Sequence, residues 1–476
     1  MQNVLQGPAT VTSMTSRPLA LDSLCARLNP WLKERLRTDA EALAKVAVDE
    51  SGLPPGRAGA VVFPKNTAEV ARIAAEASAL GIAVVPRGAG TGKSGAAMPQ
   101  NGELVVDLSQ MNRLLALMPH DQYAVVEPGL ITGDFHQAVA EVGYFYPPDP
   151  GSWESCTLGG NIATNAGGPR AVKYGVTQRY VWGLQIVTMR GDVLRFGRRS
   201  IKGVAGLDLT SLLVGSEGTL GIITEATLHI VPAPEAVETA WFSFADLFAA
   251  SRAGEALFAA GLVPRMMELL DQAALDTVRK VAPFRIPEPA GAALLIEMDG
   301  SPARATADLE RAAEIILAAG ASDSALAKNE KEREAMRRTR RLVSSALKEA
   351  YPFKMSDDIA VPRSQMVPLL EQAKAAGAST AHLVCAYGHL GDGNLHMNLL
   401  ARSAEERQHA GPLRHRIVEL AVSLGGTISG EHGLGLTKRE LLPLEQTTSV
   451  IALQRQIKQV FDPQGLLNPG KVWPDV

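Results

Sequence analysis

Small side chains dominate a long central part of this chain, and they constrain its fold more than any other feature. Glycine and other small residues prevail from residue 86 to residue 233, among short β-like runs such as "YAVVEPG" and "GIITEATLHIVP". The segment "PPDPGSWESCTLGGNIATNAGGPRAVKYG" contains few long side chains. A backbone without large side chains can approach another molecule closely. This region is therefore better suited to line a large ligand than to fill an apolar core.

A glycine-rich loop in "AVVPRGAGTGKSGAAMP", residues 83–99, resembles a phosphate-binding loop but matches neither common type. A P-loop needs a glycine five residues before its Gly-Lys-Ser, and that position is Arg87. A G-x-G-x-x-G pattern runs from Gly90 to Gly95, yet both motifs must lead into a helix. Here Pro99, an Asn-Gly turn and the strand-like "ELVVDLS" follow. The N–H groups of such a loop can still bind a pyrophosphate, and a purely structural turn is the alternative.

The composition is that of a globular protein with two or three domains. Of 476 residues, 46% are hydrophobic and 20% charged, and the net charge of −3 comes without a basic stripe, so no nucleic acid is expected as a partner. Cys25, Cys156 and Cys385 are too scattered for a disulfide scaffold or a thiolate metal site. Neither a secretory signal nor an apolar run of about eighteen residues is evident. We expect a cytoplasmic protein without a membrane span, peripheral to a membrane at most through its electron acceptor.

The densest chemistry lies near the C-terminus. In "CAYGHLGDGNLHMNLL", His389 and His396 flank a tight Gly-Asp-Gly turn, and strand alternation puts His396 and Asn398 on one face. The segment "GGTISGEHGLGLTKR" adds Glu431 and His432 between glycines. Two imidazoles and a carboxylate form a suitable ligand set for a divalent transition-metal ion. The spacing matches no zinc-hydrolase motif, and a metal-free polar cluster is the alternative.

Six motifs together give the chain a family resemblance: "PRGAGTGKSG", "DPGSWESCTLGGNIATNAGG", "GSEGTLGIITEATL", "GHLGDGNLHMN", "SGEHGLG" and "FDPQGLLNPGK". In this combination the sequence resembles the FAD-linked oxidases of the vanillyl-alcohol oxidase/p-cresol methylhydroxylase fold, from about residue 50 to the end. Within them it is similar to the D-2-hydroxyacid dehydrogenase branch, which includes D-lactate, D-2-hydroxyglutarate and glycolate dehydrogenases. The resemblance implies that the glycine-rich loop binds the pyrophosphate of FAD.

The resemblance implies an α+β fold with a two-lobed FAD-binding domain of the p-cresol methylhydroxylase type. An α+β cap domain with an antiparallel sheet would carry the substrate. We expect an N-terminal helical segment over residues 1–49, the FAD-binding domain over 50–233 and the cap domain, with the metal site, over 234–445. Residues 446–476 would return to the FAD-binding domain.

The same resemblance implies that FAD contacts come from three glycine-rich segments and from one residue near the C-terminus. The expected cofactor-binding residues are Pro86, Arg87, Gly88, Ala89, Gly90, Thr91, Gly92, Ser155, Thr157, Gly160, Asn161, Thr164, Gly168, Glu217, Gly221, Ile222 and Asn468. The glycine-rich loop contains no histidine, and Cys156 stands where these relatives bind FAD without a covalent bond. We therefore expect non-covalent FAD.

The resemblance also assigns His389, His396 and Glu431 as metal ligands and His432 as the catalytic base. A 2-hydroxyacid can chelate such an ion through its carboxylate and hydroxyl oxygens, and the ion lowers the pKa of the hydroxyl. His432 would take the hydroxyl proton while C2 passes hydride to flavin N5. Zinc is favoured, and manganese and iron fit the same ligands. In the alternative, His432 only supports a neighbouring ligand.

Further substrate contacts are expected from Asn398 and from one of two arginines. The stretch "MRRTRRLVSSALKEAYPFKMSDDIAVP" resembles the arginine-containing helix of the family and the strand behind it. Arg340 or Arg341 should bind the substrate carboxylate, because a guanidinium can hold both of its oxygens. Several arginines on one helix are also typical of a solvated face, so the choice between them stays open.

The size of the substrate depends on one position. Relatives that act on D-2-hydroxyglutarate carry a lysine two residues before the Asp of "DIAVP", and it can hold the distal carboxylate. This chain has Ser356 there, and its nearest lysine is Lys354. The departure favours a small monocarboxylate such as D-lactate. A D-2-hydroxyglutarate dehydrogenase, or the catalytic flavin subunit of a glycolate oxidase complex, is the alternative.

Two other classes of function are weaker. An NTP-binding enzyme would need a longer loop and a Walker aspartate context. An inactive flavin-binding subunit would have no use for the set of histidines and Glu431. Nothing indicates a second dinucleotide site, so we expect electrons to leave to a quinone, a cytochrome or an electron-transfer flavoprotein. A homodimer is compatible with the sequence.

Overall fold

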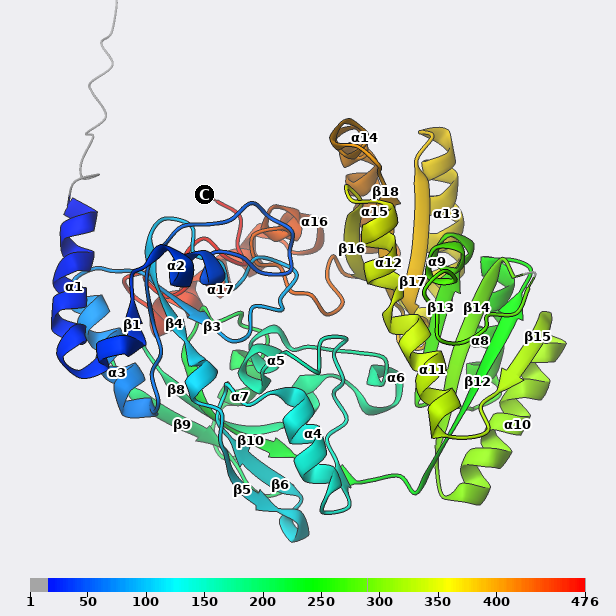
Figure 1. Cartoon of the computed structure of the whole chain (residues 1–476), viewed down its shortest axis with the longest axis horizontal. Helices are drawn as coiled ribbons and strands as arrows, with labels where there is room; N and C mark the ends of the chain where they lie inside the picture. Colours follow the sequence, from blue (N-terminus) through cyan, green and yellow to red (C-terminus); the bar gives the residue numbers. More distant parts are fainter. Residues whose placement is uncertain (1–15, 289, 476) are drawn as a thin grey trace, which may run out of the picture.

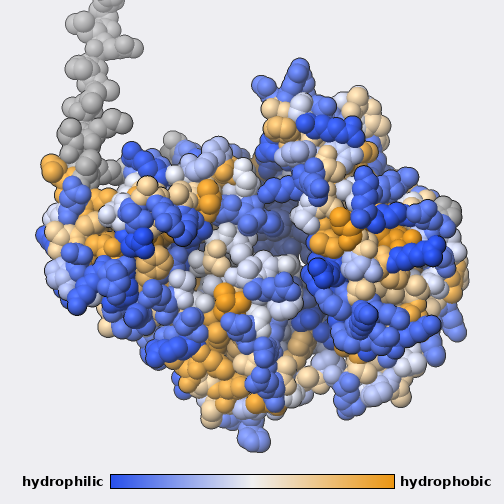
Figure 2. Space-filling view, viewed as in Figure 1, coloured by the Kyte–Doolittle hydropathy of each residue, from blue (hydrophilic) through white to orange (hydrophobic). Residues whose placement is uncertain are grey.

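The computed structural model describes residues 16–288 and 290–475, which form two halves lying side by side (Figure 1). The half on the left of Figure 1 contains two main sheets, the N-terminal helix and the C-terminal end of the chain. The other half is built on one seven-stranded sheet. Figure 2 shows a hollow between the two halves, walled mostly by hydrophilic and neutral residues.

The first sheet has four strands in the order β1-β2-β4-β3, and β2, β4 and β3 run parallel. Its elements are β1 (Leu36–Arg37), β2 (Ala58–Val62), β3 (Val84–Arg87), β4 (Glu103–Asp107), α1 (Ser16–Leu32), α2 (Ala40–Val46) and α3 (Thr67–Ala79). Parallel strands need a crossover, and α3 supplies it between β2 and β3. Asn66 caps this helix by accepting the N–H of Glu69 at 3.0 Å, and Leu28 of α1 packs with Ile73 of α3 in the core.

The N-terminal helical segment that we expected is interrupted. Between α1 and α2 the chain forms the two-residue strand β1, in which Leu36 pairs with Val62 and Arg37 with Val61. This edge strand pairs antiparallel with β2, and the side chain of Leu36 packs against the same core as α1. The first fifteen residues of the expected segment lie outside the described residues.

The second sheet has five antiparallel strands in the order β5-β6-β10-β8-β9, and a two-stranded ribbon of β11 and β7 accompanies it. Its elements are β5 (Leu114–Met118), β6 (Tyr123–Val126), β7 (Tyr144–Phe145), β8 (Val181–Val187), β9 (Val193–Gly197), β10 (Ile222–His229), β11 (Val231–Pro232), α4 (Thr132–Ala140), α5 (Leu158–Thr164), α6 (Ala171–Tyr174) and α7 (Leu209–Leu213). The first and second sheets, each with its helices, form the two lobes of this half. Strand β8 is buried along its whole length, because helices and the first lobe cover it. The small residues of the sequence concentrate in the loops around this sheet.

The large sheet has the order β15-β12-β14-β13-β17-β18-β16 and is antiparallel throughout. Its elements are β12 (Ala236–Phe244), β13 (Met266–Asp271), β14 (Ala292–Gly300), β15 (Ala321–Leu326), β16 (Met355–Ala360), β17 (Leu383–His389), β18 (Asn394–Leu400), α8 (Leu247–Ala259), α9 (Gln272–Val278), α10 (Pro302–Ala318), α11 (Glu330–Arg341), α12 (Val343–Ala350), α13 (Met366–Ser379), α14 (Ala404–His409) and α15 (Gly411–Ser423). The core on one face packs against α8, α10, α13 and α15. On the other face α9, α11 and α12 cover only part of the sheet, and the remainder faces the first half (Figure 1).

The last part of the chain returns to the first half. After α16 (Leu442–Glu445) and α17 (Thr448–Phe461), Leu467 forms a parallel bridge with Val84 of β3. The mixture of helices and antiparallel sheets confirms the α+β class. No helix in the described residues is long and apolar enough to cross a bilayer.

Candidate active site

The open face of the large sheet carries the two predicted histidine ligands. His389 ends β17 and His396 lies in β18, and the tight turn between them folds the two strands into a hairpin. Tyr387 pairs with His396, and His389 pairs with Asn394, so both histidines point to the same face. Their ring centroids are 5.3 Å apart. The hairpin thus brings together two imidazoles that are seven residues apart in sequence.

Glu431 and His432 approach this face from a loop that follows α15. The Oε1 atom of Glu431 lies 3.4 Å from Nε2 of His389, 3.8 Å from Nε2 of His396 and 3.9 Å from Nε2 of His432. His396 and His432 stack with their ring centroids 5.3 Å apart. The structure therefore brings together all four residues that the sequence proposed for the metal site and the base.

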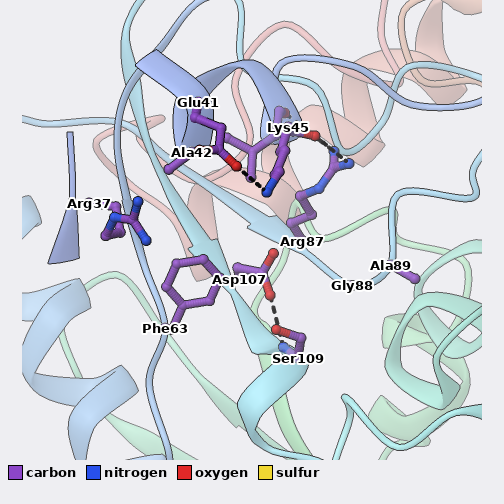
Figure 3. Close-up of a pocket in the computed structure, with 11 residues that line it drawn as sticks. Arg37, Glu41, Ala42, Lys45, Phe63, Arg87, Gly88, Ala89, Asp107 and Ser109 are labelled. Carbon is purple, nitrogen blue, oxygen red and sulfur yellow. Dashed lines mark hydrogen bonds and ion pairs between the residues drawn. The ribbon is translucent and has the colours of Figure 1, made fainter. Parts of the chain in front are cut away.

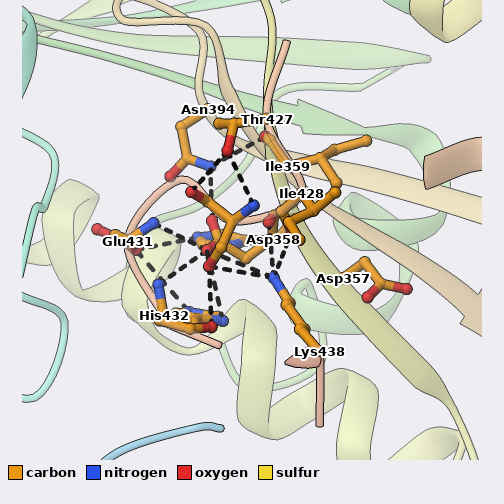
Figure 4. A network of polar contacts seen from close by, with 12 residues as sticks. Asp357, Asp358, Ile359, Asn394, Thr427, Ile428, Glu431, His432 and Lys438 are labelled. Carbon is orange, nitrogen blue, oxygen red and sulfur yellow. Dashed lines mark hydrogen bonds and ion pairs between the residues drawn. The ribbon is translucent and has the colours of Figure 1, made fainter. Parts of the chain in front are cut away.

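Asp358 holds this loop in place, and the sequence analysis missed it. It lies in β16 directly opposite His396, is fully buried, and occupies the centre of the polar network in Figure 4. Its Oδ2 accepts the N–H groups of Glu431 and His432 at 2.8 Å each, and its Oδ1 accepts Nδ2 of Asn394 at 2.6 Å. The polar contacts and His432 lower the pKa of Asp358 well below its usual range, although burial opposes this.

Glu268 is a second buried carboxylate that the sequence analysis missed. Its Oε1 lies 2.6 Å from Nδ1 of His389, and its Oε2 lies 2.6 Å from Nε of Arg340. Burial would raise the pKa of Glu268, but Arg340 and His389 lower it to about 2. The ionised carboxylate accepts a hydrogen bond from the Nδ1–H group of His389. This favours the tautomer in which Nε2, the atom that faces Glu431, carries the lone pair that can bind a metal.

The structure separates the two arginines that the sequence left as alternatives. Arg340 is buried, and its guanidinium carbon lies 4.9 Å above the ring of Tyr387. Arg341 pairs instead with Glu334 on the partly exposed side of α11. Arg340 therefore lies beside Glu268 and the open sheet face, whereas Arg341 points away from them, because successive residues of a helix point in different directions.

Burial sets the protonation of the remaining imidazoles. It lowers the pKa of His432, and together with His389 it holds the pKa of His396 well below its usual range. For His389, burial acts the same way, but Glu268 and Glu431 raise the pKa well above its usual range. A neutral His432 can accept a proton at physiological pH.

The donor set fits a divalent metal ion. Ligands about 2 Å from a tetrahedral ion lie roughly 3.3 Å from one another, and the distances from Glu431 Oε1 to the three imidazole nitrogens are 3.4 to 3.9 Å. Asp358 also lies within 4.8 Å of His396, Glu431 and His432. Its oxygens already accept several N–H groups, so it is better suited to position the ligands than to join them.

The glycine-rich loop of the first half fits an anion. In the described part of the chain, no protein acceptor takes the backbone N–H groups of residues 88–92. A Cβ atom on Gly88 would collide with the hydroxyl of Thr157, which caps α5. The loop must therefore lie flat against α5, with its N–H groups free for a pyrophosphate.

A cavity of about 340 Å³ opens beside this loop (Figure 3). Its walls come from α2, the end of β3 and the end of β4, and include Arg37, Glu41, Ala42, Lys45, Val46, Phe63, Arg87, Gly88, Ala89, Asp107 and Ser109. The guanidinium of Arg87 donates to the carbonyl of Val48 at 2.8 Å and to other carbonyls of the lobe. The guanidinium of Arg87 is therefore engaged, and its backbone stays available to contact a ligand.

The glycine-rich loop and the Glu431 loop are in direct contact. The carbonyl of Ser94 accepts the N–H of Leu436 at 2.7 Å. From the second lobe, Glu217 accepts the N–H groups of Leu434 and Gly435 at 2.7 and 2.9 Å. Burial raises the pKa of Glu217 to about 7. Segments more than two hundred residues apart in sequence thus meet at the Glu431 loop.

Comparison with protein families shows which family this chain belongs to. Residues 58–197 match the family described as "FAD binding domain", and residues 233–472 match "FAD linked oxidases, C-terminal domain". The chain belongs to the FAD-linked oxidases. As a member of this family it is an oxidoreductase that binds FAD, which confirms the predicted family and enzyme class.

Curated relatives of this FAD-linked oxidase cover most of its length. It is 39% identical to "Glycolate oxidase subunit GlcD" of Bacillus subtilis (strain 168), over 87% of this chain and 88% of that protein. It is 33% identical to "D-lactate dehydrogenase" of Anaerostipes hadrus, over 87% and 89%. It is 32% identical to "D-2-hydroxyglutarate dehydrogenase" of Stutzerimonas stutzeri (strain A1501), over 96% and 99%. The protein is thus an FAD-linked oxidoreductase of the type these three share.

A solved structure confirms the predicted fold. p-Cresol methylhydroxylase superposes on this FAD-linked oxidase with a TM-score of 0.79, covering 98% of each chain at 15% identity. At that identity the likeness concerns the fold alone. The two-lobed FAD-binding fold with an α+β cap is therefore that of the p-cresol methylhydroxylase type.

Several residues that the sequence proposed for FAD use their side chains elsewhere. Ile222 lies in the core between the lobes, and Glu217 binds the Glu431 loop. Asn161 donates to Thr132 at 2.6 Å. Others have local roles: Thr164 donates to the carbonyl of Gly160, Ser155 to that of Ser152, Asn468 to those of Ala96 and Glu217, Gly221 packs on Ile186, Gly168 packs on Asp149, and Pro86 lies beside Gly218. Oδ1 of Asn468 has no partner among the described residues, and the FAD contacts of these segments remain predictions.

Proposed function

We propose that this FAD-linked oxidase is a dehydrogenase that oxidises a D-2-hydroxyacid to the 2-oxoacid. The observation that carries the proposal is the meeting of three imidazoles at one oxygen of Glu431. This cluster lies beside the loop whose free N–H groups suit FAD. Relatives named as D-lactate, D-2-hydroxyglutarate and glycolate enzymes support the same substrate class.

In the proposed mechanism, bound FAD supplies a hydride acceptor, and a divalent ion held by His389, His396 and Glu431 supplies a Lewis acid. We favour zinc, with manganese and iron as alternatives, and non-covalent FAD. His432, neutral because of burial, accepts the hydroxyl proton of the substrate on a ring nitrogen. C2 of the substrate loses its hydrogen as hydride in the same oxidation. The acid thus loses one proton and one hydride, which together are two protons and two electrons.

Arg340 binds the substrate carboxylate in this proposal. Its Nε forms an ion pair with Oε2 of Glu268 at 2.6 Å, and its two Nη groups have no protein acceptor among the described residues. A guanidinium held in this way presents two parallel donors to a carboxylate. In this proposal Glu268 fixes both the tautomer of His389 and the orientation of Arg340.

We also propose the division of labour that the sequence suggested, with FAD bound by residues 50–233 and substrate and metal bound by residues 234–445. The last segment, 446–476, would complete the FAD-binding half, since Leu467 pairs with β3. Electrons would pass to a quinone, a cytochrome or an electron-transfer flavoprotein.

The test is an anaerobic absorption spectrum of the purified protein before and after addition of D-lactate or D-2-hydroxyglutarate. We expect a flavin band near roughly 450 nm that bleaches on addition of the acid. A protein that cannot be reconstituted with FAD, or whose flavin no 2-hydroxyacid reduces, would contradict the proposal.

A second candidate function is the catalytic flavin subunit of a glycolate oxidase complex. It is favoured by the 39% identity to a protein named as a glycolate oxidase subunit. Glycolate carries the same hydroxyl on C2 but no carbon substituent there, so the same residues could oxidise it. Fast flavin reduction by glycolate, with slow reduction by D-lactate, would favour this candidate over the first.

A further inference from the structure

A four-residue helix of the first half, α6, lies against the hairpin that carries the two proposed histidine ligands. A Cβ atom on Gly391, in the turn of that hairpin, would lie 2.7 Å from Cγ2 of Val172 in α6. Shortly before α6, a Cβ atom on Gly167 would lie 2.8 Å from Oε2 of Glu431. The segment that contains α6 therefore touches the proposed metal site at two points, the hairpin turn and Glu431.

The same segment continues directly from residues that are predicted to bind FAD. The predicted contacts from Thr157 to Gly168 lie just before α6 in the chain. In the proposed function, hydride passes from a substrate on the sheet of the second half to a flavin held by the first half. The reacting atoms must come within about 3–3.5 Å of each other. A displacement of α6 relative to the hairpin would therefore change the distance on which the reaction depends.

A buried aspartate of the second half holds α6 in its position. Asp299 lies near the end of β14, and its side chain is 1% exposed. Tyr174 of α6 donates its hydroxyl to Oδ2 of Asp299 at 2.6 Å, and the ammonium of Lys173 pairs with Oδ1. The same ammonium donates to the carbonyl of Asp299 at 3.3 Å. One aspartate therefore binds two of the four residues of α6.

A second group of contacts supports this anchor across the same boundary. Nη1 of Arg265, directly before β13, lies 3.5 Å from Oδ2 of Asp299. The guanidinium carbons of Arg265 and Arg170 lie 5.1 and 5.0 Å from the ring of Phe145 in β7. Arg170, which directly precedes α6, pairs with Asp149 at 3.1 Å. Ion pairs and cation–π contacts from both halves thus meet around Asp299.

We propose that Asp299 is a positioning residue for hydride transfer, because it fixes α6, and with it the flavin-binding segment, on the hairpin of the second half. This inference rests on the proposed function and adds a residue to it. The partners of Asp299 are Lys173, Tyr174 and Arg265, and none of the three is proposed to bind FAD, metal or substrate. Asp299 therefore acts on the reaction through the distance between the two halves.

The experiment is anaerobic stopped-flow reduction of the flavin in the holoenzyme by D-lactate, or by glycolate if it reduces wild type faster. Asp299→Asn keeps the size of the side chain but leaves the ammonium of Lys173 without its anion. We expect the limiting rate to fall about 10- to 100-fold, because a displacement of about 1 Å has an effect of this size. The apparent Kd of the acid should stay within about 3-fold, because the loss concerns the transition state alone.

Two further variants separate positioning from a general loss of stability. Tyr174→Phe removes one hydroxyl and should lower the limiting rate by about 3- to 10-fold, the range of one hydrogen bond. Asp308→Asn breaks an ion pair with Arg304 on α10 and should leave the rate unchanged. FAD and metal contents should equal those of wild type in all three proteins. A wild-type limiting rate in Asp299→Asn, a loss explained by missing FAD, or an equal loss in Asp308→Asn would overturn the inference.

Deuterium at C2 of the acid identifies the step that is slowed. In Asp299→Asn the deuterated acid should reduce the flavin more slowly than the ordinary acid, because C2 loses its hydrogen in the slow step. A variant in which both acids react at the same slow rate would have lost another step, and the positioning role would be wrong.

An exchange measurement keeps this inference distinct from the proposed function. The N–H groups of α6 are bonded within their own segment, as that of Tyr174 is to the carbonyl of Arg170 at 3.0 Å. In the holoenzyme of Asp299→Asn, the peptide with residues 169–176 should exchange hydrogen for deuterium faster than in wild type, and in Asp308→Asn it should not. This result would support the anchor even if no 2-hydroxyacid reduced the flavin and the proposed function failed. Unchanged exchange in Asp299→Asn would overturn the inference whatever the activity.

Discussion

The two walls of the hollow between the halves offer ligands in different ways. The glycine-rich loop on one wall presents backbone N–H groups, and the guanidinium of Arg87 at its start is bound within the same half of the molecule. The sheet face on the other wall presents side chains, each fixed by a buried neighbour: His389 by Glu268, and Glu431 and His432 by Asp358. A site made of backbone N–H groups is sensitive to added side-chain volume, as at Gly88. A site made of side chains depends instead on the buried residues that hold those side chains in place.

The largest effect is expected on the side-chain wall. His389→Ala should keep bound FAD but slow flavin reduction by the substrate at least about 1000-fold, because the Lewis acid contributes several kcal/mol to the transition state. The measurement is FAD content by absorbance, followed by anaerobic reduction kinetics. His415→Ala, which removes an exposed histidine on α15, is the control. Reduction of the His389→Ala protein at a near wild-type rate would contradict the metal assignment.

The matching test on the backbone wall is steric. Gly88→Val should weaken FAD binding about 100-fold or more, because the added side chain meets the hydroxyl of Thr157 and displaces the loop. Fluorescence titration of the apoprotein with FAD measures the affinity. Gly411→Ala adds a methyl group where no atom lies within 4 Å and should bind FAD normally. Unchanged affinity in Gly88→Val would mean that the pyrophosphate binds elsewhere.

Removal of the charge on Glu268 should have a smaller effect than the two changes above. Glu268→Gln keeps a hydrogen-bond acceptor for His389 but loses the negative charge, and we expect metal affinity to fall about 10- to 100-fold. Competition with a chelator, read out by metal analysis, gives the affinity, while FAD content should not change. Glu405→Gln on the exposed face of α14 is the matched control. If Glu268→Gln lost FAD instead, the two walls would not be as separate as the comparison implies.

The backbone wall was easier to predict from the sequence than the side-chain wall. A run of glycines indicates that the backbone approaches another molecule closely. The strand–loop–strand context of residues 83–99 correctly excluded the helical phosphate-binding motifs. The histidine pair and Glu431 stood out because glycines bound them. Asp358 and Glu268 did not, because each is one acidic residue in an otherwise ordinary strand, and its role depends on which strands become neighbours. An acidic residue inside a run such as "DIAVP" or "RMMELLD" was the available signal.

For other residues the sequence indicated the segment but not which of its atoms face the cofactor. Ile222 and Glu217 lie in motifs typical of FAD binding, yet the side chain of one fills the core and that of the other binds the Glu431 loop. A motif shows that a segment is near the cofactor but not which of its atoms face it. The choice between Arg340 and Arg341 likewise needed the direction of each side chain on α11.

The bond between Ser94 and Leu436 means that the two ligand sites share a mechanical connection. If the glycine-rich loop opens to admit or release FAD, either this bond and those of Glu217 break, or the loop that carries Glu431 moves with it. If the proposed metal site is correct, thermodynamic reciprocity then applies: whatever factor the metal adds to the affinity for FAD, FAD adds to the affinity for the metal. Under that proposal, FAD and the metal bind in one cooperative assembly.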